Sequence, residues 1–192
     1  MRKLVLQMQY SLDGFVAGPN GELDWIFQDF DDEFAKWNVE KLWQAGAHLM
    51  GSKTYKDMAA YWPSSKEPYA APMNQIPKIV FSRSLERADW RETRIVSGDL
   101  AQEIARLKQE PGPDLLAHGG ARFAQSLVQS GLIDEYRLIV HRVVLGKGLP
   151  IFSDLSAPIR FKVGNQITFK SGLMALELQQ PESLKLVLSP AA

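Results

Sequence analysis

The chain has 192 residues, of which 45% are hydrophobic and none is cysteine. That length and composition are sufficient for a buried core and predict one domain over residues 1–192. Without cysteine there are no disulfides, thiolate nucleophiles or cysteine-ligated metals, and three scattered histidines offer no zinc site, so we expect no metal. Basic and acidic residues balance at 22 each, so no overall field would draw the protein to nucleic acid or an anionic membrane.

The amino-terminal segment MRKLVLQMQY does not resemble a secretion signal, because it lacks a long apolar region and a small-residue cleavage site. Nor does any apolar run reach the roughly 18 residues of a membrane span. We therefore expect a cytoplasmic protein whose partners are small molecules or other proteins, with no membrane and no nucleic acid among them.

The first part of the chain alternates strands with helices. Residues 3–10 are an apolar run with interleaved glutamines, which predicts a strand. Apolar residues at helical spacing predict a helix over 31–45, with acidic residues at its start. The pattern repeats as a strand at 47–50 and a helix at 52–60, and a proline-bounded loop follows over 63–77.

The same alternation continues in the middle of the chain. KIVFS predicts a third strand at 78–82, and a weaker one follows at 94–97. Asp99 is a good N-cap residue for a helix over 100–109. A strand at 114–118 then leads through Gly119-Gly120 into a helix that Gly131 ends.

The last part of the chain is rich in strands. EYRLIVHRVVL, residues 135–145, is the most strand-like segment, and residues 158–180 predict a hairpin that turns near Lys170 to Gly172. Strands thus alternate with helices over most of the chain and pair antiparallel only at its end. We predict an α/β fold with a mainly parallel central sheet and antiparallel carboxy-terminal strands.

Three glycine-marked turns follow predicted strands: SLDG at 11–14, GSKT at 51–54 and GGAR at 119–122. Ligands of parallel sheets bind beyond the carboxyl ends of the strands. Helix N-termini carry unpaired backbone N–H groups and partial positive charge, so the second and third turns suit phosphate, although each also fits a plain turn. FSRS, residues 81–84, suits the extra phosphate that distinguishes NADP from NAD, or it presents a solvated arginine.

Four segments in this order resemble a known family: SLDG, GSKTY, FSRSLE and HGGARFAQSLVQSGLIDEYRLIVHRVVLGKGLPIF. They look like the dihydrofolate-reductase-like family, in its riboflavin biosynthesis reductase C-terminal-domain branch, here as a stand-alone domain. The resemblance spans nearly the whole chain. It implies a three-layer fold, NADPH bound across the sheet, hydride transfer to a heterocyclic or sugar-linked substrate, and a homodimer.

The resemblance also assigns residues to the cofactor. Those expected at NADPH are Gly51, Ser52, Lys53, Thr54, Ser82, Arg83, Gly119, Gly120, Ala121 and Arg122. Within this set, Ser82 and Arg83 would face the adenosine 2′-phosphate. The two glycine turns would face the cofactor phosphates.

Asp13 is the candidate catalytic residue, because the resemblance places its loop beside the nicotinamide and the substrate. Hydride delivery to C=N or C=O needs a proton for the developing anion, which a carboxyl group or an ordered water supplies. An aspartate before glycine is also an ordinary turn pair whose side chain caps backbone N–H groups. Both roles stay open at this stage.

Four residues are candidates for the substrate side: Gln7, Phe15, Trp25 and His118. Riboflavin-pathway reductases usually carry a lysine at the position of Gln7 and an arginine or lysine at the position of Phe15. At the position of His118 they usually carry a glutamate. Two cations suited to a phosphorylated substrate are therefore missing. Trp25 is interpreted as a pocket wall or lid, and His118 as a proton donor, a substrate ligand or a turn residue.

These observations predict an NADPH-dependent reductase that transfers a hydride to a small heterocyclic, pyrimidine- or pterin-like, or carbonyl or imine substrate. The activity would be similar to that of 5-amino-6-(5-phosphoribosylamino)uracil reductase, with altered substrate-site residues. Two alternatives stay open: a non-catalytic NADP-binding dimer and a dihydrofolate reductase. The second lacks a clear helix-borne acid in this sequence.

Overall fold

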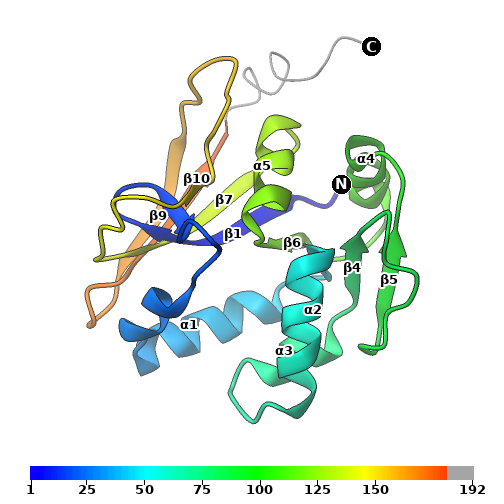
Figure 1. Cartoon of the computed structure of the whole chain (residues 1–192), viewed down its shortest axis with the longest axis horizontal. Helices are drawn as coiled ribbons and strands as arrows, with labels where there is room; N and C mark the ends of the chain where they lie inside the picture. Colours follow the sequence, from blue (N-terminus) through cyan, green and yellow to red (C-terminus); the bar gives the residue numbers. More distant parts are fainter. Residues whose placement is uncertain (181–192) are drawn as a thin grey trace.

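The computed structural model describes residues 1–180, and an eight-stranded sheet forms its centre (Figure 1). In sheet order the strands are β5 (Thr93–Val96), β4 (Lys78–Phe81), β3 (Ala47–Gly51), β6 (Leu115–His118), β1 (Leu4–Ser11), β7 (Glu135–His141), β10 (Met174–Gln179) and β9 (Lys162–Thr168). The strands from β5 to β7 pair in parallel, whereas β10 runs antiparallel to β7, and β9 antiparallel to β10. The predicted α/β class, with its antiparallel carboxy-terminal edge, is confirmed.

Helices cover both faces of the sheet and make three layers (Figure 1). They are the 3₁₀ helix η1 (Asp24–Gln28), α1 (Asp32–Trp43), α2 (Ser52–Tyr61), the 3₁₀ helix η2 (Trp62–Ser64), α3 (Ala70–Gln75), α4 (Leu100–Gln109) and α5 (Ala121–Gln129). The helices α4 and α5 bury apolar residues in one core cluster with the sheet, and α1, α2 and α3 do so on the opposite face. No helix within residues 1–180 is long and apolar enough to cross a membrane.

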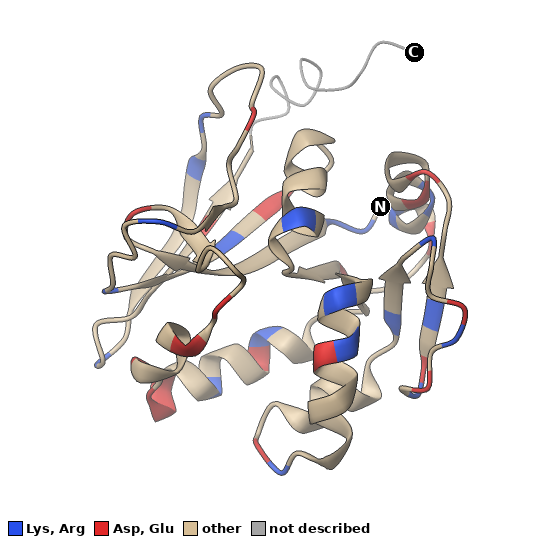
Figure 2. Ribbon diagram, in the orientation of Figure 1, with Lys and Arg blue, Asp and Glu red and all other residues tan. Residues whose placement is uncertain are grey.

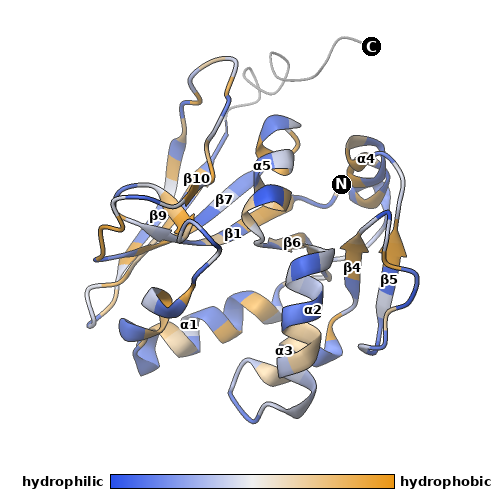
Figure 3. Ribbon diagram, viewed as in Figure 1, coloured by the Kyte–Doolittle hydropathy of each residue, from blue (hydrophilic) through white to orange (hydrophobic). Residues whose placement is uncertain are grey.

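The distribution of hydrophobic and charged residues follows these layers. Hydrophobic residues lie along the strands, most visibly in β4 and at the end of β5 (Figure 3). Acidic and basic residues are intermingled over helices and loops, as on α2, which carries both signs (Figure 2). The core is therefore built from alternate strand residues and the inner sides of the helices.

The start of α1 shows how local sequence sets an element. The Asp31 side chain accepts a hydrogen bond from the Phe34 backbone N–H at 2.7 Å and so caps the helix. Asp32 and Glu33 add negative charge at the positive end of the helix dipole. The other Asp31 carboxylate oxygen accepts from the Ser171 backbone N–H at 2.8 Å, which ties α1 to the turn of the last hairpin.

The β9–β10 hairpin turns where the sequence predicted. Phe169 and Leu173 close the turn through a backbone hydrogen bond of 2.9 Å, and Gly172 adopts a positive φ of 86° within it. That left-handed conformation explains the glycine at this position.

The segment from Pro63 to Pro77 was predicted as a loop, and the structure corrects this. It contains α3, which begins at Ala70 and places Pro72 in its first turn, where proline is tolerated. Ala70 and Met73 are buried, and Met73 belongs to one core cluster with Leu42 of α1 and Tyr55 of α2. Tertiary packing therefore stabilises a six-residue helix that the local pattern did not reveal.

The strand predicted over residues 135–145 is shorter, because β7 ends at His141. Beyond it, Val143 accepts a hydrogen bond from the Leu12 backbone N–H at 2.9 Å, and the chain turns into a loop. A second, two-stranded sheet then forms from β2 (Phe15–Ala17) and β8 (Leu149–Pro150), which the sequence did not predict. The SLDG loop is thus held against the segment that follows β7.

Candidate functional site

The three glycine-marked turns lie at one edge of the sheet. They follow β1, β3 and β6, which are parallel, so their carboxyl ends point the same way. In the sheet, β6 lies between β3 and β1. The turns after these three strands are therefore neighbours, as the sequence predicted, and this edge is the candidate site.

Two of the turns lead directly into helices without a side-chain cap. Gly51 ends β3 and is the N-cap residue of α2, and Gly120 is the N-cap residue of α5 with a positive φ of 80°. Neither helix start receives a side-chain capping hydrogen bond. Backbone N–H groups at both helix starts are therefore available to an anion.

The two turns are in direct contact. The Thr54 hydroxyl, in the first turn of α2, donates to the Gly119 carbonyl at 2.7 Å. A Cβ atom at Gly120 would lie 2.8 Å from that hydroxyl oxygen, and one at Gly51 would lie 3.3 Å from the Cβ of Phe123. Only glycine permits this approach of α2 to α5, so the glycines set the spacing of the two helix starts.

The remaining predicted residues of these turns lie at or near the surface. Lys53 is exposed and pairs with Asp57 at 3.5 Å on the next turn of α2. Arg122 is exposed at the start of α5, whereas Ser52 and Ala121 are half-buried. Both cations are therefore reachable from solvent beside the uncapped helix starts.

The FSRS segment forms a tight turn after β4. The Ser82 hydroxyl accepts from the backbone N–H groups of Ser84 at 3.2 Å and Leu85 at 3.0 Å, so it is engaged in shaping the turn. Arg83 is exposed and forms no ion pair with any residue among 1–180. The rings of Phe81 and Phe123 pack 5.3 Å apart, which brings this turn to α5.

Asp13 is held by three hydrogen bonds. Its Oδ1 accepts from the Ser11 hydroxyl at 2.7 Å and from the Leu145 backbone N–H at 3.1 Å, and its Oδ2 accepts from the Gly146 backbone N–H at 2.7 Å. The Ser11 bond, followed by the two backbone bonds, lowers the pKa of Asp13 below its ordinary value. The carboxylate is thus ionised at neutral pH and bridges two loops, which favours the capping role over proton donation.

Trp25 and Phe15 are the two aromatic residues expected on the substrate side. Trp25 is buried, its indole N–H donates to the Glu22 carbonyl at 3.2 Å, and its ring meets the His141 ring edge-on at 5.2 Å. Phe15 is half-buried and starts β2, opposite Pro150. The interpretation of Trp25 as a pocket wall or lid stays a prediction.

A row of buried polar side chains crosses the sheet beneath α1 and α3. We call it the polar row, and it consists of Lys78, His48, His118, Gln7 and Arg137, from the successive strands β4, β3, β6, β1 and β7. Side chains two positions along a strand from a row member point to the same face of the sheet, and on that face several of them pack in the apolar cluster with α1, α2 and α3. Gln7 and His118, expected at the substrate, are therefore parts of a larger buried network.

Gln7 uses both ends of its amide within this network. Its Nε2 donates to the Asn38 side chain on α1 at 2.9 Å, and its Oε1 accepts from Arg137 Nη1 at 3.1 Å. Arg137 in turn lies 3.3 Å from a Glu135 oxygen and 3.7 Å from a Glu177 oxygen. Gln7 thus links α1 to a buried ion cluster.

Burial shapes the charges of the row. It lowers the pKa of Arg137, against the opposing effect of the two glutamates beside it. Burial also lowers the pKa of Lys78 to about 8. The Lys78 ammonium donates to the Asn74 carbonyl at 2.8 Å and lies 4.6 Å from the Trp90 ring centroid. Between these two cations lie the two histidines, with His118 Nε2 2.8 Å from His48 Nδ1.

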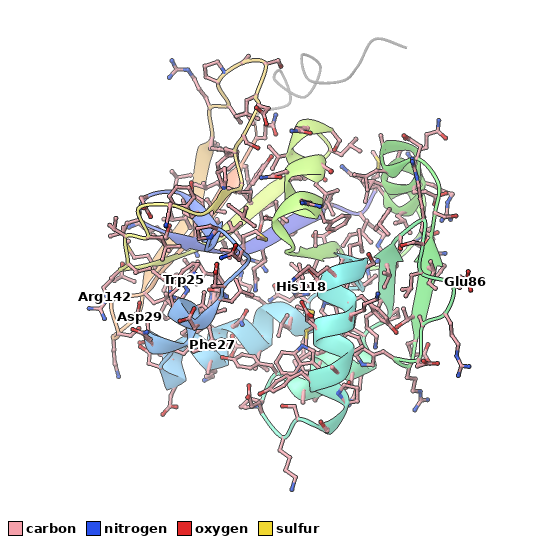
Figure 4. All side chains as sticks on the ribbon, viewed as in Figure 1. Trp25, Phe27, Asp29, Glu86, His118 and Arg142 are labelled. Carbon is pink, nitrogen blue, oxygen red and sulfur yellow. The ribbon has the colours of Figure 1, made fainter. Side chains whose placement is uncertain are left out.

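A second histidine environment lies at the end of β7. His141 Nε2 is 2.7 Å from Gln9 Oε1, and its Nδ1 is 3.6 Å from an Asp29 oxygen. Arg142 donates to the other Asp29 oxygen at 3.0 Å. Figure 4 shows Trp25, Asp29 and Arg142 close together in the view, with His118 nearer the middle of the molecule.

Sequence reasoning did not identify Asn38, Asp29, His141 or the partners of the polar row as site residues. A pattern was visible, because three of the row's strands carry a single polar residue within or at the end of an apolar run: Lys78, His48 and His118. Alternation shows that such a residue faces one side of a sheet, but not which strands are neighbours. The network therefore required the strand order.

Other features do not extend the site. A surface hollow of about 600 Å³ lies at the opposite, amino-terminal ends of the strands, lined in part by Ala47, Lys78 and Thr93. Within residues 1–180 no group of three or more histidine, aspartate or glutamate side chains could hold a metal ion. The candidate chemistry therefore depends on the glycine turns and the polar row.

Comparison with known proteins identifies relatives along most of the chain. The family described as the RibD C-terminal domain matches residues 2–175. The chain is 33% identical over 180 residues to "Uncharacterized protein YyaP" of Bacillus subtilis (strain 168), covering 91% of this chain and 93% of that protein. It is 27% identical over 162 residues to YwjB of the same organism, covering 84% and 89%.

Solved structures share the fold. A proposed riboflavin biosynthesis protein from Shewanella sp. PV-4 superposes with a TM-score of 0.74 at 23% identity, over 94% of this chain and 99% of that one. RibD of Acinetobacter baumannii superposes with a TM-score of 0.65 at 22% identity, over 95% of this chain but only 59% of that one. These findings confirm the predicted family resemblance and the predicted dihydrofolate-reductase-like fold.

Proposed function

The chain belongs to the family of the RibD C-terminal domain, and from that membership we propose that it is an NADPH-dependent reductase of a small heterocyclic substrate. The observation that carries the proposal is the contact between two uncapped helix starts, made by Thr54 and Gly119. A dinucleotide has two adjacent phosphates, and two neighbouring helix N-termini offer each of them backbone N–H groups. The family supplies the reductase chemistry to which this cofactor belongs.

The residues of the edge fit NADPH in charge and in space. The close approach at Gly120 leaves the backbone bare where a phosphate would meet it, since any side chain there would collide with Thr54. Lys53 and Arg122 add positive charge at the surface of the same helix starts. When bound, NADPH supplies a hydride, and the protein binds and orients the two reactants.

Arg83 is our candidate for choosing NADPH over NADH. It is exposed after β4, and its guanidinium forms no ion pair within residues 1–180. Guanidinium binds phosphate in a bidentate manner, which suits a 2′-phosphate. Ser82 is engaged in the turn, so we assign it the task of presenting Arg83.

Asp13 holds the loop rather than donating the proton in this proposal. Reduction of C=N or C=O consumes one hydride and one proton, and an ionised carboxylate with three hydrogen-bond donors carries no proton to give. We therefore propose that water provides the proton. Asp13 keeps the SLDG loop joined to the segment at Leu145 and Gly146.

The substrate is proposed to be neutral and planar, because the substrate side lacks the cations of riboflavin-pathway reductases. Phe15 and Trp25 offer apolar surface, and Arg137 is already occupied by Gln7 and two glutamates. A phosphorylated ribosyl group would therefore find few partners here. Pyrimidine- or pterin-like rings fit this chemistry better.

Dihydrofolate reduction is the weaker alternative. The buried residues of α1, which face the sheet, are Phe34, Asn38 and Leu42. None of them is an acid, so the helix places an amide where that reaction would use a carboxylate.

The second alternative, a non-catalytic NADP-binding dimer, shares the cofactor site and differs only in turnover. The homodimer expected from the family resemblance and the cytoplasmic location expected from the sequence stay part of the proposal.

The first test is a titration of the protein with NADPH and with NADH, followed by nicotinamide fluorescence. We expect tighter binding of NADPH, and we expect Arg83→Ala to weaken NADPH while leaving NADH unchanged. Arg87→Ala is the matched control, because Arg87 is also exposed and lies four residues further along the same loop. Equal losses in the two variants would remove Arg83 as the selecting residue.

Turnover separates the enzyme from the binding module. NADPH oxidation would be followed with aminouracils, dihydropterin, dihydrofolate and a quinone panel. Reduction of an aminouracil or pterin supports the proposal, and binding of NADPH without turnover of any of these favours the module. Absence of binding of either nucleotide would overturn the reductase proposal at its base.

A further inference from the structure

His48 and His118 share one hydrogen bond across two neighbouring strands. His118 Nε2 and His48 Nδ1 are 2.8 Å apart, and the ring centroids are 4.7 Å apart. Two bare nitrogens would repel at this distance, as would two protonated ones. One proton therefore lies between the rings, and the question is which ring owns it.

Neither ring is suited to a positive charge. Burial, opposed by the Pro72 carbonyl and helped by the neighbouring Lys78, lowers the pKa of His48 to about 4. Burial, then His48 and Arg137, lower the pKa of His118 well below its ordinary value. The pair lies between two cations of the polar row, and both rings are neutral at physiological pH.

The carbonyl of Pro72 determines which histidine ring is the donor in the hydrogen bond between them. It lies 3.3 Å from His48 Nε2, and a carbonyl oxygen only accepts, so that nitrogen carries the proton of the neutral His48 ring. His48 Nδ1 is then bare and accepts from His118 Nε2–H. The neutral His118 ring has no second proton, so its Nδ1 is bare as well.

The pair meets its surroundings through His118. His48 is 0% exposed, whereas His118 is 8% exposed and is the last residue of β6, directly before Gly119 and Gly120. Its strand neighbour Gln7 has both amide ends engaged. His118 Nδ1 is thus a neutral acceptor beside the proposed cofactor turn (Figure 4).

We propose that His48 is a positioning residue that locks His118 as the Nε2–H tautomer, so that His118 Nδ1 accepts a hydrogen bond from a ring N–H group of the substrate. The part that concerns the substrate rests on the proposed reductase function, and the part that concerns the tautomer does not. An acceptor at this point selects a ring that carries an N–H donor. It rejects a phosphate or carboxylate oxygen, which has no proton to offer.

The tautomer is tested by long-range proton–nitrogen NMR of the free protein with labelled histidine. The chain has three histidines, so single variants assign every signal. We expect both His48 and His118 as neutral Nε2–H tautomers, with neither ring titrating above pH 5. An Nδ1–H tautomer at His118, or an imidazolium at pH 7, would overturn the proposal.

Two variants of His48 separate positioning from packing. In His48→Gln the amide donates to the Pro72 carbonyl and accepts from His118, so the His118 tautomer is retained. In His48→Leu the acceptor is lost, and we expect a mixture of His118 tautomers with a pKa nearer the ordinary value. An unchanged His118 tautomer in a folded His48→Leu protein would exclude the positioning role.

The substrate arm uses 5,6-diaminouracil and its 1,3-dimethyl derivative, which lacks the ring N–H groups, both added to the NADPH-loaded protein. We expect the first to shift the His118 Nδ1 signal and the second to leave it in place. His118→Leu should weaken the first ligand about tenfold, the worth of one hydrogen bond, with little effect on the second. Equal responses to the two ligands would overturn the acceptor role, whereas failed NADPH binding with the expected tautomers would overturn only the proposed function.

Discussion

The glycine turns lie at the carboxyl edge of the sheet, whereas the polar row crosses its face from Lys78 at the start of β4 to Arg137 in β7 and reaches that edge at His118, and the two regions are built in opposite ways. The turns at Gly51 and Gly120 present backbone N–H groups at the ends of exposed helix starts. The row from Lys78 to Arg137 presents buried side chains whose partners come from distant parts of the chain. One region offers backbone groups to a ligand, and the other offers side-chain groups.

This difference separates general from specific recognition. Backbone N–H groups suit any phosphate, so the turns tolerate varied sequence provided that the glycines remain. The polar row depends on hydrogen-bond direction and protonation, so a change in one residue alters its neighbours. We therefore expect substitutions in the row to change stability and ligand choice, and substitutions in the turns to change cofactor affinity.

The largest effect is expected from Arg137→Met in the row. The change leaves Glu135, which is largely buried, without the cation beside it, whereas Glu177 keeps its ion pair with Lys41 at 2.6 Å. Removing one partner of a buried ion pair costs about 3–5 kcal/mol of unfolding free energy. Urea denaturation measures this, with Arg106→Met as the control, because Arg106 pairs with two glutamates at the surface and should cost less than about 1 kcal/mol.

A loss of similar size for the two arginines would contradict the buried character of the cluster. It would mean that water reaches Glu135 and Glu177 freely, and that the row does not depend on exact pairing. The comparison between the two regions would then lose its basis in burial.

The second effect is a dependence of stability on acid. The pKa of His48 in the folded protein, about 4, lies below its ordinary value of 6.5, so between these two pH values the unfolded chain binds a proton that the folded protein does not. This stability is present above pH 6.5 and is lost as the pH falls toward 4. Linkage gives about 3 kcal/mol for a shift of this size.

The measurement is the difference in unfolding free energy between the native protein and His48→Gln from pH 7 to pH 4. Carboxylates also titrate in this range, but they do so in both proteins and cancel in the difference. We expect the native protein to lose more stability than the variant. A difference that does not change with pH would show that His48 accepts a proton in the folded state.

The third effect concerns the turns. Gly120→Ala places a Cβ atom 2.8 Å from the Thr54 hydroxyl, at a backbone φ of 80°. We expect NADPH affinity to fall at least about tenfold, the worth of one backbone hydrogen bond to a charged phosphate. Gly21→Ala is the control, because Gly21 also has a positive φ, 93°, but its Cβ would meet nothing within 4 Å. Both variants carry the strain, and only the first should lose cofactor.

The smallest effect is expected from Asp13→Asn. The amide group would replace a carboxylate oxygen that accepts from the Gly146 backbone N–H, so two donors would face each other. Hydrogen exchange at the Leu145 and Gly146 amides should accelerate, and turnover should fall less than tenfold, as for a residue that positions a loop. Loss of turnover by about a hundredfold or more, with cofactor binding intact, would restore Asp13 as the proton donor.

Much of the fold could be predicted because its information is local. Apolar runs, the Asp31 and Asp99 caps and the glycine turns each occupy a few consecutive residues, and the structure contains the corresponding strands and helices. The exceptions were segments that are stabilised by contacts with residues distant in the sequence. Helix α3 depends on burial of Met73, and β2 exists only because β8 lies beside it.

The candidate site likewise has features that a local pattern predicted and features that depend on distant contacts. The turns at Gly51 and Gly119-Gly120 were identified in the sequence, since glycine before a helix is a local pattern with a known use. The contacts of Asp13 with Leu145 and Gly146 span more than a hundred residues and were not visible. Its two possible roles could therefore be weighed only once the loop partners were known.

The sequence by itself determined the alternation of strands and helices, the uncapped helix starts and the lack of cysteine chemistry, because each of these depends on residue type and near neighbours. The tertiary structure decided that Lys78, His48, His118 and Arg137 form one row, and which histidine owns the shared proton. Strand order and register bring these side chains together, and burial then sets their charges. Neither is a property of any short stretch of chain.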